Sequence, residues 1–426
     1  MCRATILTKD TIRRARSLHA LRQRLMQTPD SGTKAHARRR GRLYLLLAGW
    51  LLGLGFAEVL ARESFDWRPH IRNRIYFAEP DPLLGWRNRP NASGPYGSEE
   101  FTTTVTINAA GQRGPLYPFA RKPGTRRMAI LGDSQAWGDG VEDSETFAAL
   151  LDQSMPEVLN FSCPGYGTDQ ELLVLDQIAA RYRPDTVLVA LFVGNDFLDN
   201  MSAGSWQYPK PFFTLDPPDR LVLHGVPVEY SKSLHSAIEV YRGLMQHSAI
   251  ANVLADTFHR TWNAPLLIRP ALAAEPWVPH SFYEREVSAE DKAAFALTIR
   301  LLIEIARHSR AIGARPVVLL IPELWQVDLE RIPNARRPLV EAGARWRRPQ
   351  QVLTAVLRME GIQVIDALPA LARAQRAGFP AGRQVFYRGW RHLTSYGHAV
   401  VARLVRARLG AAAVSSPGPA VAGSRL

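Results

Sequence analysis

The feature that most constrains the fold is an alternation of short apolar runs and helical segments between residues 126 and 410. Each run is four to seven residues long or extends to that length, which suits a buried strand. The runs are Met128–Leu131, Val158–Phe161, Thr186–Phe192, Pro316–Ile321 and Val364–Ile365. Because the strands are apolar on both faces and alternate with helices, they predict a parallel sheet covered by helices on both sides.

One of the intervening helices has clear start and stop signals. A stretch typical of a capping box, Ser288 to Asp291, opens it, and Gly313 closes it. Between them lies an apolar stripe with helical spacing, formed by Phe295, Ile299, Leu302 and Ile305.

A serine stands directly after the first predicted strand. In MAILGDSQAWGDG, residues 128–140, the apolar run stops at Gly-Asp-Ser and leaves Ser134 at the tip of a turn. Ligands of such sheets bind at the carboxyl ends of the strands. The turn therefore puts Ser134 where a parallel sheet carries its chemistry.

Three more polar stretches fall in comparable places. NFSCPGYGTDQE brings Gly165 past the second strand, VGND brings Asn195 past the third, and RGWRHLTSYGH holds His392 before the last helical run. A serine hydroxyl needs a neighbouring base at neutral pH, and the pKa of imidazole suits that task. A backbone N–H and a side-chain amide are donors that an oxyanion requires. The set predicts acyl transfer, with Ser134 as the nucleophile and His392 as the base.

Together these stretches resemble the SGNH, or GDSL-type, hydrolase superfamily over residues 124–410. The resemblance implies a flavodoxin-like three-layer α/β/α sandwich and a serine esterase mechanism. By position it assigns the nucleophile to Ser134, the glycine donor to Gly165, the oxyanion amide to Asn195 and the base to His392. Gly167 is the alternative to Gly165.

The stretch before His392 departs from the family pattern. Members usually carry an Asp two or three residues before the histidine, where this chain has Trp390 and Gly389. Either another acid or a backbone carbonyl orients the imidazole, or the site works as a Ser-His dyad, or activity has been lost. His398, at the start of the last helix, is predicted to be structural or to support the site.

Other catalytic signatures fail. GDSQA has Ala136 where a nucleophile elbow needs glycine, and GYGTDQ has Gln170 at the third glycine position of a dinucleotide loop. No P-loop, His-Glu-x-x-His or Cys-x-x-Cys motif occurs. Cys2 and Cys163 offer neither a disulfide framework nor a metal site, and Cys163 is predicted to be a buried apolar side chain. We therefore expect no cofactor and no metal.

The net charge of +14 is concentrated at the N-terminus. Residues 1–42 carry +10, which leaves +4 for the other 384 residues, an ordinary surface balance. No nucleic-acid partner is expected, because no basic groove remains. Residues 1–42 are predicted to be a basic cytoplasmic arm.

An apolar stretch, residues 43–61, follows this arm. Its apolar length of about 15 to 19 residues is marginal for a membrane span. A buried core helix and a cleavable signal peptide ending near Ala61 are the alternatives. The favoured prediction is an uncleaved transmembrane anchor in a bacterial inner membrane, with the catalytic domain in the periplasm or outside the cell. DPLLGWRNRPN, residues 81–91, supports this, because it resembles the leader of membrane-anchored bacterial members of the superfamily.

Three further parts complete the predicted domain organisation. Residues 63–123, rich in turn formers around the alternating run FTTTVTINAAGQRG, are predicted to form a small accessory β region. Residues 200–286, rich in proline and aromatic residues, are predicted to be an insertion, either over the active edge of the sheet or as a helical side lobe. Residues 411–426 are predicted to be a mobile tail.

These features predict a membrane-anchored serine esterase that acts on small acyl esters, with an acylated small molecule or carbohydrate as its substrate and O-acetylated glycans as the expected class. An acyltransferase that modifies an envelope polysaccharide would use the same residues and is the first alternative. A catalytically inactive glycan-binding or assembly protein is the second, because of the missing Asp.

Overall fold

The computed structural model describes residues 22, 31–64, 77–98, 100–153, 157–205, 208–217, 219–230, several residues of 236–254, 281–284, 286–328 and 345–414. Much of the predicted arm, residues 255–280 of the predicted insertion and residues 415–426 of the predicted tail lie outside the described residues. The chain divides into two compact units, Met1–Trp67 and Arg68–Leu426.

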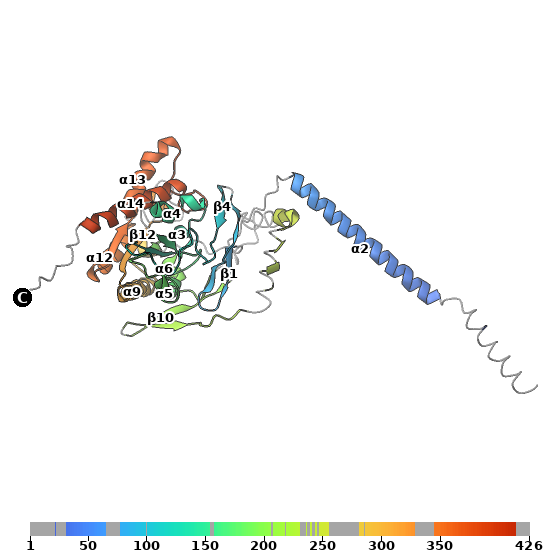
Figure 1. Ribbon diagram of the computed structural model, residues 1–426, viewed down its shortest axis with the longest axis horizontal. Coiled ribbons are helices and arrows are strands. Elements are labelled where there is room, and N and C mark those ends of the chain that lie inside the picture. The colour runs from blue at the N-terminus through green and yellow to red at the C-terminus, as the bar shows by residue number, and fades with distance from the viewer. Residues whose placement is uncertain are drawn as a thin grey trace, which may run out of the picture. The chain divides into compact units, whose positions relative to one another are not determined.

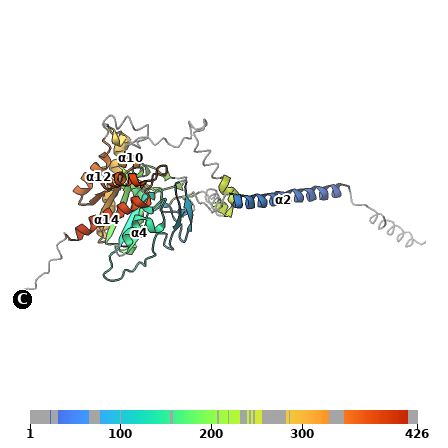
Figure 2. The same ribbon diagram turned by 90° about the horizontal axis from the view of Figure 1, so that it is seen from above.

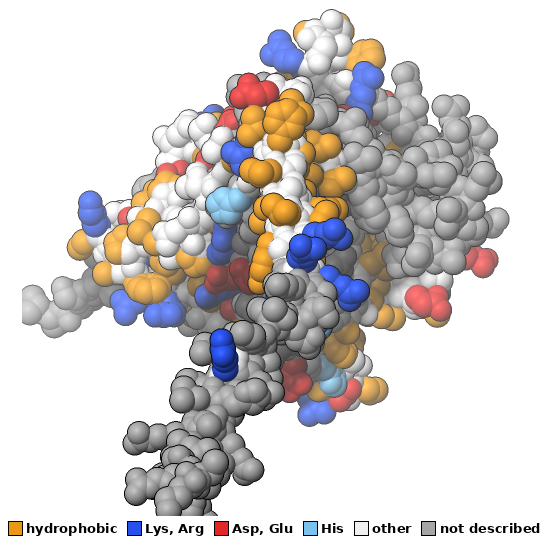
Figure 3. Space-filling model, turned by 90° about the vertical axis from the view of Figure 1, so that its right-hand side faces the viewer, with side chains coloured by type: hydrophobic (Ala, Val, Ile, Leu, Met, Phe, Trp, Pro, Cys, Tyr) orange, Lys and Arg blue, Asp and Glu red, His pale blue; other side chains and the backbone are white. Residues whose placement is uncertain are grey.

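The first unit contains one long helix, α2 (Ser31–Ser64). Its segment Arg38–Ser64, with a mean hydropathy of 1.9, is long and apolar enough to cross a membrane, and none of its most apolar window is buried. The predicted span of residues 43–61 lies inside this segment. Its exposed hydrophobic side chains are visible in Figure 3 as an orange column with basic side chains at one end.

The second unit is built on a five-stranded parallel sheet with the order β13-β12-β7-β5-β6. Its strands are β5 (Met128–Gly132), β6 (Val158–Asn160), β7 (Thr186–Phe192), β12 (Arg315–Ile321) and β13 (Gln363–Asp366). Counted along the chain, this is the 2-1-3-4-5 order of flavodoxin-like folds. All five predicted apolar runs are therefore strands of one parallel sheet, as predicted.

Helices cover both faces of this sheet (Figures 1 and 2). One layer consists of α5 (Thr168–Gln177), α9 (Ala289–Ala311) and α12 (Arg348–Met359), and the other of α4 (Phe147–Asp152), α13 (Leu368–Gly378) and α14 (Ser395–Val414). Alternate residues of β7 point to the two layers: Val187, Val189 and Leu191 join the first core, and Leu188 and Ala190 the second. The predicted three-layer α/β/α sandwich is confirmed.

Helix α9 begins and ends as its sequence predicts. The Ser288 side chain accepts a hydrogen bond from the backbone N–H of Asp291, and the helix ends at Ala311, two residues before Gly313. Phe295, Leu302 and Ile305 of its apolar stripe are buried in the core.

The accessory region consists of two hairpins within the second unit. Strand β1 (Ala78–Asp81) pairs with β2 (Gly85–Asn88), and β3 (Ser93–Gly97) pairs with β4 (Thr102–Thr106), both antiparallel. Burial alternates along β4, where Thr103 and Val105 are covered. The strand predicted from this alternation is present.

The described start of the predicted insertion is β structure. It contains β8 (Gly204–Ser205), β9 (Tyr208–Pro209), and the hairpin of β10 (Phe212–Asp216) with β11 (Arg220–His224). Strand β10 contacts α5 and α9, and Arg300 of α9 donates to the carbonyl of Asp219 at the hairpin turn. This hairpin thus lies on the helix layer, whereas residues 249–254 of the same predicted insertion are helical. Phe213 of this hairpin is buried in the core that these helices share, and Leu221 packs against that core.

The remaining elements are short. They are α3 (Ser134–Trp137), η2 (Asp143–Glu145), η3 (Ala179–Tyr182), α6 (Asp196–Asp199), η4 (Ser281–Tyr283), α10 (Leu324–Val327) and η6 (Phe379–Ala381).

Candidate active site

The turn after β5 positions Ser134 at the carboxyl end of the central strands. The Asp133 carboxylate accepts the backbone N–H of Gln135 at 2.9 Å and caps the short helix α3, whose first residue is Ser134. A Cβ at Gly132 would lie 2.6 Å from the Cβ of Ala136, so only glycine lets α3 fold back so closely on the strand. Ser134 is consequently almost buried, with 5% of its surface exposed.

His392 faces this serine. Its Nε2 lies 2.8 Å from Ser134 Oγ, and its Nδ1 lies 2.8 Å from the backbone carbonyl oxygen of Trp390. A carbonyl oxygen only accepts, so the neutral ring carries its hydrogen on Nδ1, and the lone pair of Nε2 can accept the serine proton. The structure brings together the two residues predicted as nucleophile and base, although they are 258 positions apart.

The Nδ1 partner answers the question raised by the missing Asp. Of the alternatives predicted from the sequence, a backbone carbonyl occupies the place of the acid. A carboxylate nevertheless lies close by, because Asp139 Oδ2 is 3.9 Å from Nε2 of His392. The sequence analysis missed Asp139, and the only available signal was its place five residues after Ser134 in the same turn.

Asp139 is buried among hydrogen-bond donors. Its Oδ1 accepts the Tyr96 hydroxyl at 2.9 Å and the Trp390 indole N–H at 2.8 Å, and none of its side chain is exposed. Tyr96 comes from the accessory strand β3, and Trp390 precedes His392. The carboxylate therefore joins the nucleophile turn, the accessory region and the histidine loop.

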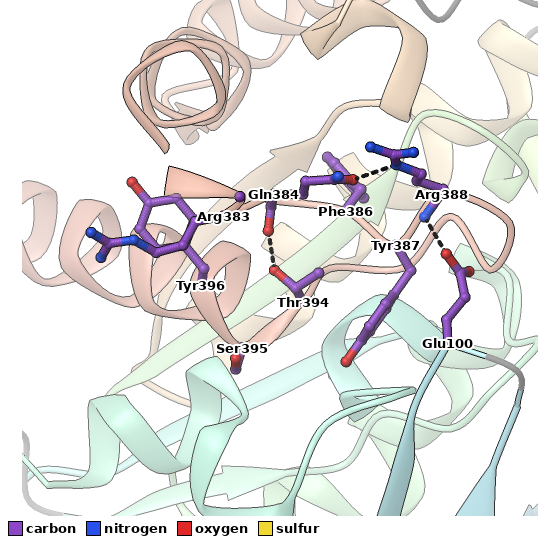
Figure 4. Close-up of a pocket in the computed structure, with 10 residues that line it drawn as sticks. Glu100, Arg383, Gln384, Phe386, Tyr387, Arg388, Thr394, Ser395 and Tyr396 are labelled. Carbon is purple, nitrogen blue, oxygen red and sulfur yellow. Dashed lines mark hydrogen bonds between the residues drawn. The ribbon is translucent and has the colours of Figure 1, made fainter. Parts of the chain in front are cut away.

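The accessory region also holds the histidine loop through Glu100. The carboxylate of Glu100 accepts the backbone N–H groups of Arg388, Gly389 and Trp390 at 2.8, 2.8 and 2.6 Å. Figure 4 shows the first of these bonds. Three converging bonds fix the backbone of the loop just before His392.

Arg113 of the accessory region supports the nucleophile turn. Its guanidinium donates to the carbonyl oxygens of Trp137 and Gly138 at 3.1 and 2.6 Å, and to that of Val141 at 2.6 Å. The same group lies 4.7 Å from the centre of the Trp137 ring. These bonds satisfy the carbonyl groups at the end of α3, which has no further helical turn to do so.

Strand β2, the second strand of the first accessory hairpin, contacts the loop that carries Gly165. The Trp86 indole N–H donates to the Pro164 carbonyl at 3.0 Å, and the Tyr166 hydroxyl donates to the Trp86 carbonyl at 2.7 Å. Asn88 donates to the Ser162 carbonyl at 2.9 Å. The accessory region thus contacts three of the loops that carry predicted site residues. These are the loop after β5 with Ser134, the loop after β6 with Gly165 and the loop before α14 with His392.

Gly165 occupies a tight turn beside the nucleophile strand. Its φ of +79° and the preceding Pro164 match the third and second positions of a type II turn, closed by the bond from Tyr166 N to Cys163 O. Cys163 N donates to Gly132 O at 3.1 Å and ties the turn to β5. Gly167 instead precedes α5, where a Cβ would meet Asn200 and Asp169 side-chain oxygens within 2.9 Å. Gly165 is therefore the better placed of the two glycines.

Asn195 follows β7 on the other side of β5. Its Nδ2 donates to Asp199 Oδ2 at 2.7 Å, which orients the amide and uses one of its two hydrogens. The loops of Gly165 and Asn195 therefore flank the strand of Ser134, because β5 pairs with both β6 and β7.

A cluster of buried acids lies beneath these loops. It contains the buried Asp169, Glu171 and Asp196 and the partly buried Asp199, with Lys210 of the insertion paired to Asp169. Burial raises the pKa of Asp199 to about 7, and burial followed by the charge of Asp133 raises the pKa values of Glu171 and Asp196. Burial is also the largest influence on Asp169, and it raises the pKa against the charge of Lys210. Burial therefore shifts each of these carboxyl groups toward its protonated form.

His398 and Cys163 have structural surroundings. His398 is buried, accepts the Phe147 N–H on Nδ1 at 3.1 Å, and burial lowers its pKa to about 3. It stacks on the Phe147 ring, with centroids 5.7 Å apart. Cys163 is buried as predicted, and burial raises the pKa of its thiol. Neither side chain suits proton transfer near pH 7.

A cavity of about 470 Å³ lies beside the histidine loop (Figure 4). Its lining comes from Glu100 and from both ends of the loop around His392, and most of it is polar: Arg383, Gln384, Arg388, Thr394 and Ser395. Within the described parts of the chain, no three metal-ligating side chains gather into a site that could hold a metal ion.

Comparison with known proteins gives one family match. Residues 280–422 match the family described as an SGNH hydrolase-like domain, acetyltransferase AlgX. The matched segment contains His392 and begins after Ser134, Gly165 and Asn195. No curated protein matches the chain.

Several solved structures are similar to the chain at low identity. TesA is 16% identical with a TM-score of 0.34, and covers 67% of this chain and 98% of its own. The psychrotrophic esterase EstA from Pseudoalteromonas sp. is 12% identical with a TM-score of 0.35, over 68% and 100%. Axe2, an acetylxylan esterase from Geobacillus stearothermophilus, is 10% identical with a TM-score of 0.34, over 68% and 97%.

Proposed function

We infer, from the premise that this chain carries an SGNH hydrolase-like domain, that it is a serine esterase which removes small acyl groups through an acyl-enzyme on Ser134. The observation that carries this proposal is the 2.8 Å approach of His392 Nε2 to Ser134 Oγ, with Nδ1 held by a carbonyl oxygen. This arrangement makes the imidazole an acceptor toward the hydroxyl, which is the role of a general base.

The reaction proceeds in two halves. Ser134 Oγ attacks the ester carbonyl carbon while its proton passes to His392 Nε2, and the tetrahedral oxyanion is stabilised by the N–H groups of Gly165 and Ser134 and by the Asn195 amide. The C–O bond of the alcohol then breaks, and the leaving oxygen takes the proton from Nε2. Water next attacks the acyl-serine, gives a proton to Nε2, and releases the acid as Ser134 regains its hydrogen.

The substrate class is a small acyl ester, with O-acetyl groups of exported glycans as the favoured case. Ser134 is almost buried, so a bulky acyl group has little access to its hydroxyl, and the polar cavity beside the histidine loop offers hydroxyl and charged side chains to a sugar. The helix α2 is proposed to anchor the chain in the inner membrane with the site facing outward.

Transfer of the acyl group to a glycan hydroxyl is the second candidate. The family description names an acetyltransferase, and the chemistry differs only in whether water or a sugar hydroxyl attacks the acyl-serine. A transferase releases little free acetate until a glycan acceptor is added, whereas an esterase does not need one.

The test is hydrolysis of p-nitrophenyl acetate by the full-length protein in detergent, beside its Ser134→Ala variant. Ser93→Ala is the matched control, because Ser93 is an exposed serine on accessory strand β3, where its hydroxyl bonds to that of Thr106. We expect turnover in the wild type and the control and none in Ser134→Ala. Equal turnover in all three, or a folded wild type that is inactive with and without a glycan acceptor, would refute the proposal.

A further inference from the structure

The Nδ1 side of His392 is held by Trp390, which is itself bound by residues from distant parts of the chain. Trp390 is fixed at three points: its carbonyl accepts from His392 Nδ1, its backbone N–H donates to Glu100, and its indole N–H donates to Asp139. A Cβ at Gly389 would lie 3.2 Å from Glu100 Oε2, so the Glu100 carboxylate fills the space that a side chain there would need. The loop is therefore built around carboxylates from other parts of the chain.

Asp139 lies on the other side of the imidazole. Its Oδ2 is 3.9 Å from Nε2, the nitrogen that takes the serine proton, and its backbone N–H donates to the Ser134 carbonyl at 3.1 Å. It is fully buried, so water does not screen its charge from the ring. Two donors, Tyr96 and Trp390, meet its other oxygen, which suits a carboxylate because that group only accepts.

We propose that Asp139 substitutes for the acid missing before His392, as a positioning residue that holds Trp390 and as the charge that stabilises the imidazolium. The role rests on the proposed function. The two parts of the role use different oxygens of Asp139. Its Oδ1 accepts the indole N–H of Trp390, the residue whose carbonyl oxygen bonds to His392 Nδ1. Its Oδ2 lies near His392 Nε2, which receives the serine proton. Asp139, on the same turn as Ser134, thereby orients and stabilises the His392 ring as an acid just before the histidine would.

Other charged groups also surround His392. Glu100 binds the backbone before it, and Asp133 Oδ2 lies 3.4 Å from Ser134 Oγ. Arg113 lies behind α3, and His398 is held neutral by a pKa of about 3. Of these groups, Asp139 is the carboxylate that forms an ion pair with the imidazole when the ring is protonated.

The experiment measures the protonation of His392 directly. Histidine ring signals of the full-length, ¹⁵N-histidine-labelled protein in detergent are titrated and assigned with His392→Gln, in the wild type, Asp139→Asn and Tyr96→Phe. Asparagine keeps an oxygen for both donors but removes the charge. We expect the titration midpoint of His392 to fall by about one to two pH units in Asp139→Asn, as for an opposite charge lost within about 4 Å. Tyr96→Phe, the matched control, removes a neighbour of Asp139 without removing the charge, and is expected to leave the midpoint unchanged.

Kinetics separate the two parts of the role. Each unit of lost imidazolium stabilisation is about a tenfold loss of rate, so kcat of Asp139→Asn is expected to fall about ten- to a hundredfold while KM changes little. Trp390→Phe keeps the charge and loses the indole donor, and is expected to lower kcat without moving the His392 midpoint. If Asp139 had a merely structural role, Asp139→Asn would lower kcat and leave the His392 titration midpoint unchanged.

The outcomes are decisive in both directions. A His392 midpoint that is the same in wild type and in folded Asp139→Asn would overturn the proposal. Should that variant fail to fold by circular dichroism, the wild-type titration decides: a midpoint above the ordinary value of about 6.5 supports a stabilising carboxylate, and one below it overturns the proposal. If the wild type proves catalytically inactive, the proposed function fails, and the titration still tests Asp139.

Discussion

The substitution Glu100→Ala tests whether the accessory region is part of the catalytic apparatus. Glu100 lies 292 positions before His392 in the chain, yet its carboxylate accepts three backbone N–H groups of the histidine loop at 2.6 to 2.8 Å. Those bonds hold Trp390, whose carbonyl orients the imidazole. Removing the carboxylate should therefore loosen the base without touching any residue of the nucleophile turn.

The size of the effect follows from the number and exposure of the bonds. A hydrogen bond to a charged group contributes about 1.5 to 3 kcal/mol when buried. Glu100 is exposed, so water replaces much of that, and we expect a total loss of about 1 to 2 kcal/mol in the free energy of unfolding. A displacement of the imidazole by a fraction of an ångström to about 1 Å should lower kcat about ten- to a hundredfold.

The assay is kcat and KM for p-nitrophenyl acetate, together with the thermal midpoint of the full-length protein in detergent. Glu79→Ala is the matched control, because Glu79 is a carboxylate of the same region that pairs with the half-exposed Arg87 of the neighbouring strand β2. We expect the control to retain wild-type kcat. Unchanged kcat in Glu100→Ala, with the loss of stability present, would refute the claim that this carboxylate positions His392.

Three further outcomes follow from the same contacts. Gly132→Ala puts a Cβ 2.6 Å from that of Ala136 and should lower the free energy of unfolding by about 1 to 3 kcal/mol, as measured by urea denaturation. Because Ser134 shifts with the turn, kcat should also fall. A fully active and fully stable variant would contradict this reasoning. Lys210→Met leaves Asp169 buried without its cation and should cost about 3 to 5 kcal/mol at pH 7, and adding Asp169→Asn should recover part of the loss. Because the pKa of Asp199 rises from 3.8 to about 7 on folding, the folded state binds more protons than the unfolded chain between these values, so this group makes stability fall as pH rises from about 4 to 7. Asp199→Asn should flatten that slope in denaturation curves at pH 5, 6, 7 and 8, and an unchanged slope would assign it to other groups.

Sequence alone predicted the parts of this protein that depend on local patterns. The five apolar runs became the five strands, since a strand buried on both faces needs a continuous apolar stretch wherever it lies in the chain. The cap at Ser288 and the alternation in β4 were equally local. The pairing of Ser134 with His392 was predicted because a serine at a strand end and a histidine in a polar loop are complementary in chemistry, and the fold carries both to one edge of the sheet.

Only the tertiary structure decided what surrounds the imidazole. The Nδ1 partner is a backbone carbonyl, which every residue possesses and which therefore leaves no mark in a sequence. Asp139 meets Trp390 across 251 positions, and Glu100 meets the same residue across 290, so neither contact has a spacing that a local pattern could reveal. The insertion, too, could not be resolved from its sequence, because proline and aromatic content does not distinguish the hairpin that lies on α5 and α9 from the helical residues 249–254 that follow it. Local periodicity determines which segments are strands and helices, whereas the electrostatics of the site depend on which loops the folded sheet brings to the same edge.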